Sequence, residues 1–334
     1  MKLKITGDVN NSGPEYNELN RNSKGGTELM LEALYQQVPE EVLNNFQIIP
    51  SRVRELKNKR RILWLHDLPQ DPESQHLKDG GWEKFEKIVY VSHWQKQQYQ
   101  NYLGVPPSKG VVLQNAIVPI EAHTKPDPNE CINIIYHTTP HRGLELLVPI
   151  LEHIEKELTD VKWHLDVYSS FSIYGWSERD VPYQPLFDKI KNHPNMTYHG
   201  AVSNQEVREA LKKAHIFALP SIWPETSCIA MLEAMSARCI CVHSSLAALP
   251  ETAANWTLMY DYSETPNEHA GICAGVLHDA LLLVHDKNMQ ERLNMQKAYI
   301  DGFYTWEVRK KQWETMLRNV LSLPSSQKTS IDKK

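Results

Sequence analysis

Two carboxylates with seven residues between them, Glu225 and Glu233, lie in the stretch PSIWPETSCIAMLE at residues 220–233. An apolar run ends at Pro220, a polar segment follows, and a second apolar run contains Glu233. This pattern predicts a buried strand, a tight loop and a buried helix. An unpaired carboxylate inside such a helix would cost several kcal/mol, so Glu233 must have a partner.

The start of the predicted helix suits an anion. Thr226 or Ser227 is a good N-cap, and Pro224 lies just outside the helix, where a missing N–H costs nothing. The first turn, which includes Cys228 and Ile229, offers free N–H groups that favour negative charge. At 1.5 Å of rise per residue, Glu225 and Glu233 would be roughly 12 Å apart along the axis. A sugar–diphosphate–ribose molecule needs groups of these kinds in this order.

Glu225-x7-Glu233, in the setting PS…PE…LEAM, resembles the donor-site motif of family 4 glycosyltransferases, which are retaining enzymes of GT-B fold. The resemblance implies that Glu225 contacts the sugar, the helix N-terminus holds the diphosphate and Glu233 holds the ribose hydroxyls. Arg238 departs from the motif, because the family usually has a glycine there, and the helix is expected to end without a left-handed cap residue. The alternative is a solvated Glu225 and a Glu233 that forms a salt bridge, for example with Arg238.

A second candidate group is Arg142, in the segment HTTPHRG that follows the predicted strand 131–136. A guanidinium at a strand-to-helix turn suits a diphosphate, because it is permanently charged and forked. The resemblance implies that this arginine replaces the usual lysine of the phosphate clamp. Tyr136 stands where a second basic residue is common, which leaves Thr138 and Thr139 as possible hydroxyl substitutes. The alternative is a surface arginine.

Two further loops resemble family elements. Gly25, Gly26 and Thr27 separate the predicted first strand, 2–9, from a helix, and paired glycines let the backbone approach a phosphate. The loop resembles the family's GG-x-E loop, which faces the donor, although a plain turn is the simpler interpretation. The turn at 200–202 resembles one whose backbone contacts the nucleobase, which makes Gly200 and Val202 candidates.

His66 and Asp67 follow the predicted strand 61–65. Polar residues just past the carboxyl end of a strand in an open α/β sheet lie in the ligand crevice. The resemblance places a His or Asp of this loop near the transferred sugar. The alternative is a loop turn capped by Asp67.

Strands alternate with helices through the chain, which predicts an α/β fold with mostly parallel sheets. At 334 residues, the chain suits two domains. We expect a GT-B architecture of two Rossmann-like domains with a donor/acceptor cleft between them. The expected limits are an acceptor-side domain at 1–120, a linker to 130, a nucleotide-sugar domain at 130–302, a helix crossing back to the first domain at 303–322, and a disordered tail at 323–334.

The composition of the chain argues against several classes of protein. A net charge of −5 argues against non-specific nucleic-acid binding, and no apolar run approaches the length of a membrane helix. The start of the chain is too short and polar for a signal peptide. Five cysteines without a C-x-x-C pair indicate a reducing, cytoplasmic compartment. Peripheral membrane attachment is common in the family, but no basic amphipathic stretch demands it. No acidic or histidine cluster has metal-ligand spacing, so we expect metal independence and no cofactor.

The residues and the resemblance together predict a retaining transfer of a hexose-type sugar from a nucleotide-diphosphate sugar to a carbohydrate, lipid-linked or other acceptor. Catalytic roles are expected for Glu225, Arg142 and His66. One alternative keeps the fold but changes the reaction to that of an epimerase or a phosphorylase. Another is a non-catalytic nucleotide-sugar binding protein. A dinucleotide dehydrogenase is disfavoured, because no G-x-G-x-x-G follows the first strand.

Overall fold

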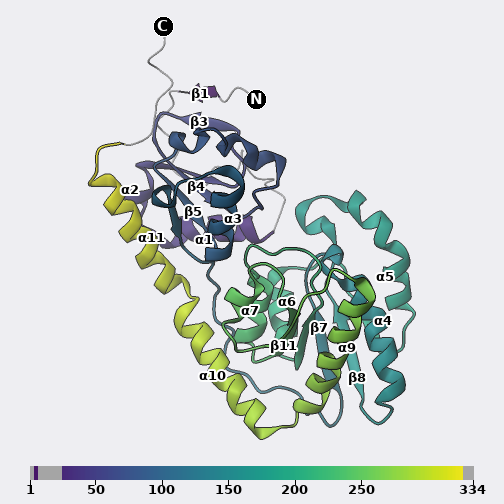
Figure 1. Ribbon diagram of the computed structural model, residues 1–334. Helices are drawn as coiled ribbons and strands as arrows, with labels where there is room; N and C mark the ends of the chain where they lie inside the picture. The colour runs from purple at the N-terminus through teal and green to yellow at the C-terminus, as the bar shows by residue number, and fades with distance from the viewer. Residues whose placement is uncertain (1–3, 7–24, 326–334) are drawn as a thin grey trace. The chain divides into compact units, whose positions relative to one another are not determined.

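The computed structural model describes residues 4–6 and 25–325 (Figure 1). Contacts divide the chain into two compact units, Met1–Ala116 with Trp306–Lys334, and Ile117–Thr305. We call them the N-unit and the C-unit. Acceptor contacts are expected from loops of the first domain such as 10–24 and 68–82, and the loop 10–24 lies outside the described residues. So do most of the predicted first strand and the predicted tail beyond residue 325.

The N-unit is built on a parallel four-stranded sheet of order β2-β4-β5-β6, beside a separate parallel pair, β1 and β3. The helix α11, which follows the C-unit in the chain, packs against α1 and α2 (Figure 1). The helices and strands of the N-unit are β1 (Lys4–Thr6), α1 (Gly26–Gln37), α2 (Glu40–Leu43), β2 (Phe46–Pro50), β3 (Glu55–Lys57), β4 (Arg60–Leu65), β5 (Lys87–Tyr90), α3 (His93–Leu103), β6 (Gly110–Val112) and α11 (Trp306–Leu321).

The C-unit is built on a parallel six-stranded sheet of order β12-β11-β10-β7-β8-β9. The helices α4 and α9 pack against each other, and α7 packs against α6 and α10. Its elements are β7 (Ile132–Tyr136), α4 (Leu144–Glu157), β8 (Trp163–Val167), α5 (Gln184–Lys191), β9 (Met196–Tyr198), α6 (Asn204–Leu211), β10 (Ile216–Leu219), α7 (Ile229–Ser236), β11 (Ile240–Ser244), α8 (Leu249–Ala253), β12 (Leu258–Tyr260), α9 (Pro266–Leu283) and α10 (Lys287–Phe303).

The predicted alternation of strands and helices is confirmed. The run FQIIP predicts a strand at 46–50, which has the same limits as β2. The prediction missed β3 and β12, which are three residues long. A proline inside a helix predicts a kink or an early end, and Pro149 lies inside α4. An early end is wrong, because α4 continues to Glu157. Packing of Leu147, Val148 and Leu151 in the core of the C-unit offsets the lost hydrogen bond.

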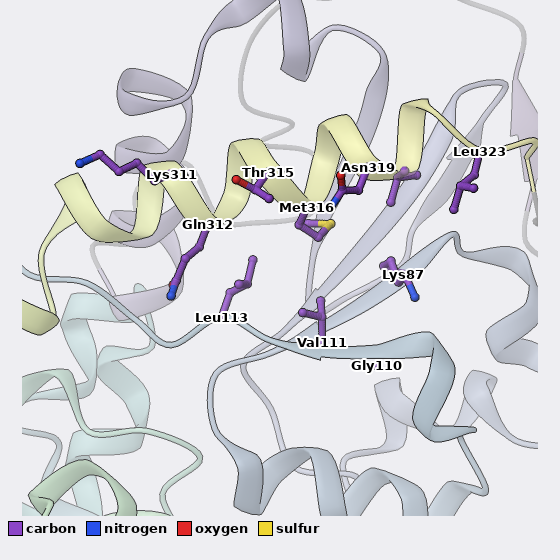
Figure 2. A pocket seen from close by; sticks show the side chains of 11 residues that line it. Lys87, Gly110, Val111, Leu113, Lys311, Gln312, Thr315, Met316, Asn319 and Leu323 are labelled. Carbon is purple, nitrogen blue, oxygen red and sulfur yellow. The ribbon is translucent and has the colours of Figure 1, made fainter.

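A cavity of about 580 Å³ in the N-unit lies between β6 and α11 (Figure 2). Leu113, Val111 and Met316 line it together with amide side chains and two lysines, Lys87 and Lys311. No carboxylate is among the described residues that line it. Across the described parts of the chain, no helix is long and apolar enough to cross a membrane.

The C-terminus of α7 corrects the expectation for Arg238. This residue itself has a left-handed backbone, with φ of 60°. Its N–H donates to the carbonyl of Met235 at 3.1 Å, and the N–H of Cys239 donates to the carbonyl of Ala234 at 3.0 Å. These two bonds form a Schellman motif, so the left-handed cap is present although an arginine supplies it.

Replacing Arg238 with glycine tests the cost of this cap. A side chain with Cβ is strained at positive φ, so we expect Arg238→Gly to raise the free energy of unfolding by about 0.5–1 kcal/mol. Ala237→Gly is the matched control, because Ala237 has φ of −80° and should lose about the same amount. Urea unfolding of the three proteins measures both effects. An Arg238→Gly variant less stable than wild type would contradict the prediction.

Candidate functional site

The loops after two neighbouring strands of the C-unit bring Arg142 and Glu225 together. Arg142 follows β7 and Glu225 follows β10, and these strands are paired in parallel. Nη1 of Arg142 donates to Oε1 of Glu225, and the Glu225 residue is only 4% exposed. Burial raises the pKa of the Glu225 carboxyl, while Arg142 opposes that shift. The interpretation of a solvated Glu225 is therefore wrong.

The turn that holds Arg142 is fixed by its neighbours. Nε of Arg142 donates to Oγ1 of Thr139 at 3.0 Å, and the Tyr136 hydroxyl donates to the Thr139 carbonyl at 2.8 Å. Gly143 has φ of 113°, and a Cβ there would lie 2.0 Å from the carbonyl oxygen of Pro220. Only glycine therefore lets the Arg142 turn pack against the loop of Glu225. Thr139 positions the arginine, and its role as a ligand stays a prediction.

Glu233 has the partner that its burial requires, but the partner is not Arg238. Nη1 of Arg208 donates to Oε1 of Glu233 at 3.2 Å, and Nδ2 of Asn204 lies 3.4 and 3.5 Å from the two carboxylate oxygens. Arg208 also donates to the carbonyls of Val118 and Pro119. Burial raises the pKa of the Glu233 carboxyl, and Arg208 and Asn204 oppose that shift.

The helix start differs from the expectation. Neither Thr226 nor Ser227 caps α7; the N-cap residue is Cys228, and no side-chain hydrogen bond caps the helix. The sulfur of Cys228 faces the N–H groups of Met231 and Ala230, and burial raises the pKa of this thiol to about 12. Since α7 begins only at Ile229, the rise per helical residue does not set the separation of Glu225 and Glu233.

The turn at Gly200–Val202 leads directly into α6, whose first residue is Asn204. Gly200 has φ of 69°, and Ser203 and Glu206 form a capping box at the helix start. The turn that the family resemblance assigned to the nucleobase therefore precedes the helix that contacts Glu233. Thr138 lies between Arg142 and β7 in sequence and is partly exposed.

The candidates of the N-unit lie around the start of α1 and the end of β4. Gly25 is the N-cap of α1, and Gly26 and Thr27 are its first residues. His66 donates its backbone N–H to Oγ of Ser51 at 2.9 Å, and its ring centroid is 4.7 Å from that of Trp64. Burial lowers the pKa of the His66 imidazole to about 3, so this ring is neutral near pH 7.

Asp67 does not cap the turn that follows it. The cap residue is Asp71, whose carboxylate accepts from the N–H of Glu73 at 2.8 Å. Burial raises the pKa of the Asp67 carboxyl, and the nearby charges of Asp71 and Glu28 raise it further. Glu28 belongs to the first turn of α1, so the glycine loop and the loop after β4 are near each other.

Sequence reasoning missed Asn204 and Arg208. The two are four residues apart on α6 and therefore share a helix face, a signal that the sequence contains. Nothing in the sequence shows that this face meets Glu233. Among the described residues, no group of three His, Cys, Asp or Glu side chains could hold a metal ion.

Comparison with protein-family models matches residues 120–292 to the glycosyl transferases group 1 family. The chain belongs to this family. A relative in Arabidopsis thaliana, which is a subunit of phosphatidylinositol N-acetylglucosaminyltransferase, is 26% identical over 170 residues. That match covers 50% of this chain, and the chain spans only 36% of the relative's length.

Solved structures support the GT-B fold of this group 1 chain. A glycosyltransferase from Rickettsia africae has a TM-score of 0.62 at 13% identity, with 96% of this chain and 91% of that chain covered. Sucrose-phosphate synthase from Thermosynechococcus elongatus has a TM-score of 0.61 at 14% identity, with coverages of 86% and 79%. The chain therefore has two Rossmann-like domains of GT-B type.

Gly143→Ala tests the contact between the two loops of the site. The added Cβ meets the Pro220 carbonyl and stands on a left-handed backbone, so we expect a loss of about 2–4 kcal/mol in the free energy of unfolding. Gly271→Ala is the control, because a Cβ at that position in α9 meets no atom within 4 Å. Thermal unfolding of both variants measures the difference, and equal melting temperatures would refute the proposed constraint.

His66→Gln tests the neutral buried imidazole. The folded pKa of about 3 lies below the ordinary 6.5, so the unfolded chain binds more protons between these values. The contribution of His66 to the free energy of unfolding is fully present above about pH 6.5. It falls as the pH is lowered, by about 2 kcal/mol at pH 5. The variant should lack this loss when urea unfolding is compared at about pH 7.5 and pH 5. His278→Gln, at a partly exposed position of α9, should keep the wild-type pH dependence, and the same dependence in His66→Gln would contradict the assignment.

Proposed function

We propose that this protein transfers a hexose-type sugar from a nucleotide-diphosphate sugar to an acceptor, with retention at the anomeric carbon and without a metal ion. The observation that carries the proposal is the ion pair of the half-buried Arg142 with the buried Glu225, at the carboxyl ends of β7 and β10. Ligands of open α/β sheets bind at this edge of the sheet. The Arabidopsis relative, whose name is that of an N-acetylglucosaminyltransferase, supports a hexose-type donor.

In this proposal, the leaving diphosphate replaces Glu225 as the partner of Arg142. The guanidinium and the N–H groups at the start of α7 neutralise the charge that develops as the bond between the anomeric carbon and the phosphate oxygen breaks. The acceptor oxygen bonds to the same face of that carbon, and its proton passes to the leaving phosphate. Glu225, freed from Arg142, orients the sugar.

Glu233 and the turn at Gly200–Val202 take the nucleoside end of the donor in the same proposal. Arg208 and Asn204 keep the Glu233 carboxylate in place, so its oxygens can accept from ribose hydroxyls. The roles of Gly25, Gly26, Thr27, His66 and Asp67 toward the sugar or the acceptor are part of the proposal. The acceptor is a carbohydrate, a lipid-linked sugar or a related hydroxyl compound.

Separate variants of Arg142 and Glu225 test the assignment. We expect UDP, GDP or ADP to raise the melting temperature of the wild-type protein, and Arg142→Met to bind that nucleotide about tenfold or more weakly, because a charge-assisted bond is lost. Glu225→Gln should bind the nucleotide at least as well as wild type, because Arg142 is released, but transfer sugar about a hundredfold more slowly. Transfer is measured with a panel of nucleotide sugars.

Arg318→Met, at an exposed arginine of α11, is the control and should bind and transfer as wild type does. Excess EDTA should leave the rate unchanged, and the product should keep the donor's anomeric configuration. Turnover near wild type in both site variants would refute the site. Nucleotide binding without transfer would favour the alternative of a non-catalytic binding protein.

A further inference from the structure

A cavity of about 410 Å³ in the C-unit lies at the end of the six-stranded sheet opposite to Arg142 and Glu225. His215 immediately precedes β10 and Ile240 begins β11, so this is the edge where parallel strands start. The cavity also takes residues from the segment 123–128 and from the junction of α9 and α10. It is therefore distinct from the proposed donor site.

The charged and titratable side chains that line this cavity are all basic: Lys125, Arg238, His123, His215 and His285. In the described part of the chain, Lys125 bonds to two carbonyls and the Cys239 sulfur, and Nη2 of Arg238 lies 3.5 Å from Oε1 of Gln290; none of these partners is a carboxylate. None of the residues that line the cavity is acidic. The acid nearest in sequence, Asp127, is fully exposed and accepts from Asn129; its charge acts on His215 and His285, but its side chain does not line the cavity. Two cationic side chains thus share a cavity without a counter-charge from its walls.

The donors of the cavity are only partly used. The Lys125 ammonium donates to the carbonyls of Leu211 and Ala214 and lies 3.8 Å from the sulfur of Cys239, so its hydrogen bonds are satisfied while its charge has no negative partner. Burial lowers the pKa of Lys125. Nε of Arg238 and Nε2 of His123 are buried and have no hydrogen-bond partner. Both ring nitrogens of His215 are taken, by Asn133 and Pro126, so this histidine shapes the cavity without serving a ligand.

The backbone adds an independent observation. Arg238 occupies the left-handed cap position of α7, where glycine would be free of strain, and it brings its guanidinium to the cavity. Backbone strain of this kind clusters at functional sites, so the observed strain at Arg238 motivates a functional hypothesis. We propose that this cavity binds a phosphate-bearing anion, which pairs with Arg238 and Lys125 and supplies the missing negative charge.

The test uses inorganic phosphate and glycerol phosphate as probes, with binding followed by the rise in melting temperature. Wild type should be stabilised in a saturable way, and Arg238→Gly should bind about tenfold or more weakly although it is expected to be the more stable protein. Lys125→Met should weaken binding similarly. A loss of binding without a loss of stability in Arg238→Gly cannot come from misfolding.

Two controls separate this cavity from the donor site and from general charge effects. Arg142→Met should keep the part of the phosphate response that depends on Arg238, and Lys156→Met in the last turn of α4 should keep the whole response. A stronger response to glycerol phosphate than to phosphate would identify an organic phosphate as the ligand class, and the reverse would identify the free ion. An unchanged response in Arg238→Gly, its loss in Arg142→Met, or no response in wild type would overturn the proposal.

Discussion

The ion pair of the half-buried Arg142 with the buried Glu225 is the interaction on which the candidate site depends. Each charge would be costly in this environment without the other, and each comes from a loop that follows a different strand. The pair therefore ties the ends of β7 and β10 together, and Gly143 permits it by leaving room for the Pro220 carbonyl. A diphosphate that replaces Glu225 would exchange one anion for another, so Arg142 would not be left uncompensated.

The helix α7, which contains Glu233, is held by polar contacts at defined points. Its buried side chains, such as Met231 and Leu232, pack without orientation-specific bonds, whereas Glu233 bonds to Arg208 of α6. At the C-terminal end of α7, the hydroxyl of Ser236 accepts from the N–H of Ile120, and the Ser236 carbonyl accepts from Lys297 at 3.0 Å. Apolar packing thus gives the helix stability, and the polar contacts fix its rotation and position.

The left-handed backbone of Arg238 costs stability, but it places a charged side chain in the cavity. The Schellman motif forms with an arginine, so hydrogen bonding at the helix end outweighs the steric cost of the left-handed backbone. A glycine would form the same motif with less strain. Unlike a glycine, the arginine introduces a cation into a cavity that no acidic residue lines.

Periodicity and turn residues in the sequence determined the α/β class, the buried strand and helix around Glu225 and Glu233, and the need of Glu233 for a partner, because these depend on local patterns and on desolvation. The identity of the partners was decided by tertiary structure. Arg142 and Glu225 are 83 residues apart and Arg208 and Glu233 are 25 apart, so strand order and helix packing bring them together. The helix start at Cys228 and the left-handed Arg238 likewise depend on packing, which overrides the cap preferences of single residues.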